Sequence, residues 1–161
     1  MNLSAASASR SLTVDTTAPT LLSSTPADNA SGVSVSNDLT FTFSEPIVKG
    51  TGSVVVKNMS NLTSLSIPIT DSQFTVSGTT LTYNPTANLT AGKNYAIEIP
   101  SGAIKDSVGN PYAGTVDDTT LNFGTTFATG AATISLGVYG NLIKPIQVEG
   151  HWYYFWDSDG D

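Results

Sequence analysis

Short segments in which apolar and polar residues alternate recur along the chain, and turn-forming residues separate them at regular intervals. In Leu39–Phe43 apolar side chains alternate with threonines, a period of two that gives a strand one buried and one solvated face. Ser77-Gly78 separates Gln73–Val76 from Thr79–Tyr83 and is typical of a hairpin turn. Short strands spaced in this way predict an all-β sandwich or barrel.

The sequence gives almost no indication of helices. Ser101–Ser107 is the single helical candidate, of a turn or two at most, and no segment sustains a 3.6-residue period, which excludes parallel βαβ folds. We therefore expect a two-sheet antiparallel sandwich of about seven strands, in which Pro68 marks an edge strand. The residues expected to be largely buried in it are Leu39, Phe41, Phe43, Val54, Val56, Leu81, Tyr83, Tyr95, Ile97, Leu121 and Phe123.

Charged residues are scarce and mostly acidic, which limits the possible partners. They make up 12% of the chain, only six are basic, and the net charge is −7. Nucleic acids and anionic membrane surfaces both attract basic patches, so a nucleic-acid partner is excluded and binding to an anionic membrane surface is disfavoured. An acidic balance suits divalent cations. The chain has no cysteine, hence no disulfide or thiolate site, and no apolar stretch long enough for a transmembrane helix.

Most residues of the common catalytic arrangements are missing. His151 is the only histidine and lies beyond the predicted sandwich, so a Ser-His-Asp arrangement would have to be built around that one imidazole. Neither a Gly-x-Ser-x-Gly elbow nor a phosphate-binding loop occurs. Glycoside hydrolysis needs a cleft between two acids, and the acids here lie mostly at strand ends and in loops. We expect no enzymatic activity and assign no catalytic residue.

Five short motifs follow one another along most of the chain. They are Asp15–Pro19 (DTTAP), Ser24–Asn29 (STPADN), Phe41–Pro46 (FTFSEP), Leu89–Tyr95 (LTAGKNY) and Gly102–Asn110 (GAIKDSVGN). Their order and spacing resemble the SbsA-type bacterial immunoglobulin-like (Ig-like) domain. This family occurs in S-layer proteins and long repetitive adhesins, including calcium-dependent ones. The resemblance implies an Ig-like β-sandwich with an extracellular structural role.

Tyr95 lies where such a sandwich carries a tyrosine corner. In that arrangement a tyrosine at the start of the sixth strand returns its hydroxyl to the backbone just upstream. Leu89 and Gly92 in the preceding loop favour this interpretation. The alternative is an ordinary half-buried strand tyrosine.

Carboxylates converge on one pole of the predicted Ig topology. Successive strands run up and down, so the loops after the second and sixth strands return to the end at which the chain enters. These segments carry Asp15, Glu45, Asp106 and Asn110, which we expect to form part of a calcium site facing a preceding module, since calcium takes six to eight oxygen ligands. The alternative is that Asp106 and Asn110 only cap a local turn and that Glu45 is an exposed loop acid.

The C-terminal tail ends in alternating acids. Asp157, Asp159 and Asp161 resemble the opening of an EF-hand-like or dockerin-like calcium loop, whose later bidentate acid this chain does not reach. We therefore predict a linker over residues 1–14, a sandwich over 15–130, and the start of an incomplete following module over 131–161.

An aromatic run precedes these acids. Trp152, Tyr154 and Trp156 belong to it, and we expect the run to form a core strand of the following module, because alternating aromatic residues usually face inward. The alternative is a stacking platform for a sugar or a peptide, since Trp and Tyr offer flat apolar faces with polar tips.

Together these features predict a non-enzymatic structural or spacer module of a secreted bacterial adhesin or S-layer-like protein, repeated in tandem and stiffened by calcium at its joints. Its partners would be neighbouring domains of the same chain, with a surface glycan or peptide bound through other modules. The alternatives are a carbohydrate- or peptide-binding module and an accessory domain of a secreted polysaccharide-degrading enzyme. Met1–Arg10 has no apolar core preceded by positive charge, so the export signal is expected outside this chain.

Overall fold

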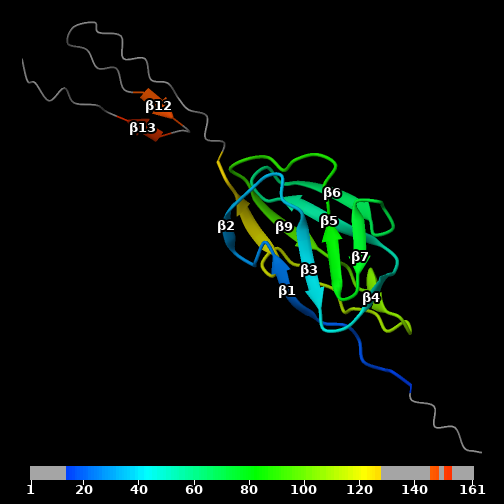
Figure 1. Ribbon diagram of the computed structural model, residues 1–161. Helices are drawn as coiled ribbons and strands as arrows, with labels where there is room; N and C mark the ends of the chain where they lie inside the picture. The colour runs from blue at the N-terminus through cyan, green and yellow to red at the C-terminus, as the bar shows by residue number, and fades with distance from the viewer. Residues whose placement is uncertain (1–13, 128–145, 149–150, 154–161) are drawn as a thin grey trace, which may run out of the picture. The chain divides into compact units, whose positions relative to one another are not determined.

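The computed structural model describes residues 14–127, 146–148 and 151–153 and is all-β (Figure 1). The chain divides into two compact units, residues 1–128 and 129–161. In the second unit, β12 (Ile146–Val148) pairs antiparallel with β13 (His151–Tyr153). The rest of the description concerns the first unit. Whether residues 131–161 begin a further module stays a prediction.

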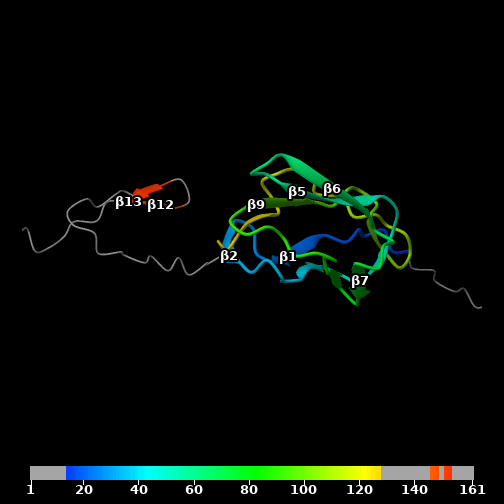
Figure 2. The same ribbon diagram turned by 90° about the horizontal axis from the view of Figure 1, so that it is seen from above.

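Two sheets packed as layers form the first unit, as predicted, and their strand pairs are antiparallel except for β2 with β11. Figure 2 shows β5, β6 and β9 in one layer and β1 and β7 in the other. One sheet has four strands in the order β1 (Leu21–Thr25), β3 (Leu39–Phe43), β8 (Thr80–Tyr83) and β7 (Phe74–Ser77). The other has five strands in the order β2 (Ala30–Val33), β11 (Asn122–Thr125), β9 (Asn94–Glu98), β5 (Ser53–Asn58) and β6 (Thr63–Pro68). A separate two-stranded ribbon joins β4 (Ile47–Lys49) to β10 (Ile104–Asp106).

The core lies between the two layers and contains every residue that was expected in it. Cross-strand register explains why these residues share one face, since Phe41 lies opposite Leu81 and Leu39 opposite Tyr83. The Tyr83 ring in turn stacks on Phe74 at 4.9 Å between ring centroids. The predicted hairpin at Ser77-Gly78 is confirmed by the β7–β8 pairing, and β6, which ends at Pro68, is an edge strand.

Ser101–Ser107 was expected to hold a helical turn, and this prediction is wrong. Ile104 and Asp106 are buried on either side of half-buried Lys105, which is the period of a strand, and they pair with β4. A left-handed Gly102, with φ of +78°, turns the chain just before this strand. None of the described residues forms a helix, so none of them provides a helix long and apolar enough to cross a membrane.

The tyrosine corner is confirmed. The hydroxyl of Tyr95 accepts a hydrogen bond from the backbone N–H of Thr90 at 2.9 Å and a second from the Asn58 amide at 3.3 Å. Its ring is buried against Phe123 at 5.9 Å between centroids. This contact fixes the loop before β9 to the core, as the Ig-like sandwich requires.

Two features of chain direction were not predicted. The β2 and β11 strands pair in parallel, whereas all the other strand pairs of this unit are antiparallel. The chain also enters the sandwich at one end, along the blue segment before β1, and leaves it at the opposite end, along the yellow segment after β11 (Figure 1). The two ends of the domain therefore face away from each other.

Candidate metal site at the pole where the chain enters

Three acidic residues from separate segments meet where the chain enters the sandwich. Asp15 lies in the segment before β1, Glu45 follows β3, and Asp106 ends β10. One carboxylate oxygen from each lies within 4.8 Å of the others. Asp15 is exposed, Glu45 half-buried and Asp106 buried, so the group opens toward solvent on the side of Asp15. The structure thus brings together three of the four residues expected at this pole as possible ligands.

Asp106 is held by the loop that follows it. Its Oδ1 atom accepts hydrogen bonds from the backbone N–H groups of Val108, Gly109 and Asn110 at 3.0, 2.6 and 2.7 Å. Burial alone would raise the pKa of Asp106, but the hydrogen bonds from Asn110, Gly109 and Val108 outweigh it and hold the pKa below its ordinary value. Asp106 therefore caps a local turn through Oδ1, whereas its Oδ2 atom accepts no backbone hydrogen bond.

Asn110 has a position that the sequence pattern did not predict. Its amide nitrogen donates to the Asp15 carbonyl at 3.1 Å, the Thr17 carbonyl at 3.2 Å and Asp106 Oδ2 at 2.7 Å. The side chain therefore ties the entering segment to the sandwich and orients Asp106. A role for its carbonyl oxygen as a calcium ligand stays a prediction, and it would require the amide to turn over.

No cation of the protein balances these charges among residues 14–127. The ion pairs in that range are those of Lys57 with Glu98 and Asp118, and neither acid belongs to the group. The pKa of Glu45 is raised, first by desolvation and then by the negative charges of Asp15 and Asp106. The chemistry suits a divalent cation, because carboxylates and backbone carbonyls are the ligands that calcium prefers.

The comparison with protein families matches residues 15–129, the whole of the sandwich just described, to the family described as bacterial Ig-like domain. This chain belongs to that family. Bacterial Ig-like domains are generally non-catalytic structural modules, typically of surface or extracellular proteins. A comparison with curated proteins found no match.

The other predicted site residues lie in the tail, beyond the bacterial Ig-like domain. Trp152 belongs to β13, and its backbone pairs with that of Gln147. The structure describes only the backbone of this residue. Tyr154, Trp156, Asp157, Asp159 and Asp161 lie outside the described residues altogether. The calcium-like loop and the aromatic platform therefore stay predictions.

Proposed function

We propose that this bacterial Ig-like domain, of the SbsA type by its motifs, is a structural spacer of a secreted adhesin or S-layer-like protein. The observation that carries the proposal is that the chain enters and leaves at opposite ends of the sandwich (Figure 1). Copies linked end to end would extend away from a cell surface, and tension would pass through each domain from one pole to the other.

The parallel pairing of β2 and β11 suits a domain under such tension. One end of the pair is fixed by the Asn29 N–H, which donates to the Asn122 carbonyl at 2.8 Å, and the other by the Thr126 N–H, which donates to the Val33 carbonyl at 2.8 Å. Pulling on the two chain ends draws β2 and β11 in opposite directions along their length. The hydrogen bonds between them lie across that direction, so they share the load and must break together.

Removing one of these hydrogen bonds should make the domain unfold faster under a pulling force. In Thr126→Pro the backbone loses the N–H that binds Val33, because proline has no amide hydrogen. We expect the unfolding rate of the full chain, pulled from its two ends at constant force, to rise up to about tenfold, the equivalent of one net hydrogen bond. Thr126→Ala keeps the N–H and removes only the long hydroxyl contact with the Val33 carbonyl, at 3.4 Å, so it should unfold at nearly the parent rate. A parent domain that extends under low force without resistance would contradict the spacer function.

The three acids at the entering pole would stiffen the joint if they bind calcium, which is the second part of the proposal. An ion held by Asp15, Glu45 and Asp106 would fix the segment before β1 to the loop after β3 and to the end of β10. Three carboxylates are fewer than the six to eight oxygens that calcium takes. Backbone carbonyls, waters or a preceding module would complete the set, so we expect weak binding, with a Kd of about 0.1–1 mM.

Glu45→Gln separates the acidic repulsion from the binding of calcium. A carboxyl whose pKa is raised on folding contributes stability below its unfolded pKa and loses it as the pH rises through the folded pKa. Without calcium, at neutral pH, Glu45→Gln should therefore melt at a higher temperature than the parent, and this gain should vanish at a pH below the ordinary range of glutamate. Thermal unfolding followed by circular dichroism at both pH values measures the difference.

Calcium should reverse the order of the melting temperatures, so that the parent melts at a higher temperature than Glu45→Gln. At ten times Kd, an ion that binds only the folded parent adds about 1.4 kcal/mol to its free energy of unfolding, whereas Glu45→Gln should gain much less. Asp38→Asn, the same kind of change at an exposed position that makes no side-chain hydrogen bond among the described residues, should respond to calcium as the parent does. If calcium shifts neither melting temperature nor heat of binding in the parent, the joint is not stiffened by this ion.

A further inference from the structure

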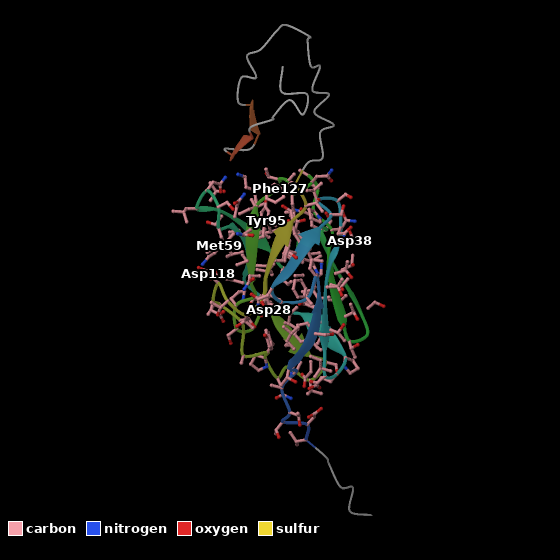
Figure 3. The ribbon with its side chains drawn as sticks, turned by 90° about the vertical axis from the view of Figure 1, so that its left-hand side faces the viewer. Asp28, Asp38, Met59, Tyr95, Asp118 and Phe127 are labelled. Atoms are coloured by element: carbon pink, nitrogen blue, oxygen red, sulfur yellow. The ribbon has the colours of Figure 1, made fainter. Side chains whose placement is uncertain are left out.

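A groove of about 380 Å³ lies on the outer face of the five-stranded sheet, and none of the three acids lines it. Its floor is the backbone of the paired strands β9 and β11, where Asn94 lies opposite Gly124. Gly124 has no side chain to fill the space above it, and the nearest atom that a Cβ would meet is Asn94 Oδ1, at 3.1 Å. Met59 and Asp118, both labelled in Figure 3, also line the groove.

The polar side chains along the groove are held in place by the fold. The amide nitrogen of Asn122 donates to the Thr119 carbonyl at 3.0 Å, and that of Asn29 donates to Asp28 at 2.7 Å. Asp118 accepts from Lys57 through one carboxylate oxygen at 2.9 Å. Each of these groups keeps further hydrogen-bonding capacity, because an amide and a carboxylate offer more than one such position.

Two neighbouring turns make the rim rigid. The turn before Asn122 is capped by Asp117, whose pKa falls to about 2 because the hydroxyl and N–H groups of Thr119 and Thr120 donate to its carboxylate. On the other side, Asp28 accepts the N–H of Asn122 at 3.1 Å. Asn94 differs from these residues, since no hydrogen bond of the described structure uses its carboxamide.

We propose that this groove binds neutral sugar residues of a glycan. A sugar hydroxyl both donates and accepts, and the amides of Asn29, Asn94 and Asn122 present both kinds of group. The nearby carboxylates of Asp28 and Asp118 would repel an acidic ligand, and the ammonium group of Lys57 is already paired with Glu98 and Asp118.

The floor of the groove disfavours an extended peptide. A peptide that adds to a sheet needs unpaired backbone groups at an edge, whereas the backbones of β9 and β11 are paired with each other. The Met59 thioether provides an apolar contact for the C–H groups of a sugar ring. Because the groove is open and lacks an exposed aromatic platform, we expect affinities in the millimolar range. The proposal does not depend on the spacer function, and either can fail without the other.

NMR spectroscopy of the ¹⁵N-labelled full chain tests the proposal. The probes are maltotetraose and chitotriose, which are neutral, together with trigalacturonate as an acidic sugar and a neutral serine-glycine peptide. At least one neutral sugar should shift the amide resonances of Asn94, Asn122 and Gly124 with a Kd of about 1–10 mM, and neither the acidic sugar nor the peptide should do so. The proposal is overturned if no neutral sugar shifts these resonances at about 50 mM, or if the acidic sugar or the peptide binds as well.

Two variants separate binding in the groove from binding elsewhere. Gly124→Val fills the floor with a residue that favours strands and should weaken binding at least about tenfold, a loss of about 1.4 kcal/mol. Asn94→Ala removes an amide that the fold does not use and should weaken binding about threefold or more, about 0.6 kcal/mol. Ser66→Val, on β6 outside the groove, is the matched control and should bind as the parent does. Unchanged affinity in both groove variants would place the sugar elsewhere and overturn the proposal.

Discussion

Phe43→Ala should lower the free energy of unfolding by about 3–5 kcal/mol, the largest loss that we expect from a single core substitution. The Phe43 side chain is 1% exposed, and its ring meets that of Tyr112 edge to face, with centroids 5.3 Å apart. Truncation would leave a cavity between β3 and the segment after β10. Because small domains have about 5–15 kcal/mol of stability, urea denaturation followed by circular dichroism should show a much lower midpoint.

Phe127→Ala is the matched control, since it deletes the same atoms from the surface. Phe127 is 65% exposed and rests against Gly92. Removing this ring should lower the free energy of unfolding by less than about 1 kcal/mol. Equal losses for the two phenylalanines would mean that the core is not packed as described.

Gly50→Ala should cost about 1–3 kcal/mol or more, although it adds only one methyl group. Gly50 lies at the end of β4, and its N–H donates to the Ala103 carbonyl at 2.8 Å. An added Cβ would collide with the backbone carbonyl of Gly102, which cannot rotate away as a side chain can. The two segments would have to separate, and the β4–β10 ribbon would lose hydrogen bonds.

Gly124→Ala is the control variant for Gly50→Ala. There the added Cβ meets the end of the flexible Asn94 side chain at 3.1 Å, which can move at little cost. We expect a loss below about 1 kcal/mol, measured by the same urea titration. If the two alanine variants were equally stable, the close approach at Gly50 would not limit the fold.

Much of the sandwich could be predicted because its strands bury alternate residues. Leu39–Phe43 and Ser53–Asn58 show that alternation in both sequence and burial. The ribbon of β4 and β10 was missed because three-residue strands are too short to show a period. The parallel pairing of β2 and β11 was missed as well, because a period of two is the same in parallel and antiparallel strands.

The meeting of Asp15, Glu45 and Asp106 could be predicted although the strand count was too low. All that it required was that the connections after β3 and β9 return to the end at which the chain enters. The direction of the Asn110 amide could not be predicted, because an amide carries both donors and an acceptor, and only its neighbours decide which one is used. The groove had no sequence signal, since Met59, Asn94 and Asp118 come from separate segments and form no motif.

If such domains are linked in tandem, as proposed, the tie between Asn110 and the entering segment would set where the array can bend. A joint pivots only where the backbone can rotate. Asn110 holds the carbonyls of Asp15 and Thr17, and Pro19 is rigid and keeps Ala18 extended. The five residues before β1, about 17 Å of contour, are therefore not free to rotate, and any hinge at this end of the domain is shorter by that length. Shorter hinges restrict a distal domain to a narrower cone of orientations, so this one amide would increase the bending stiffness of the whole filament.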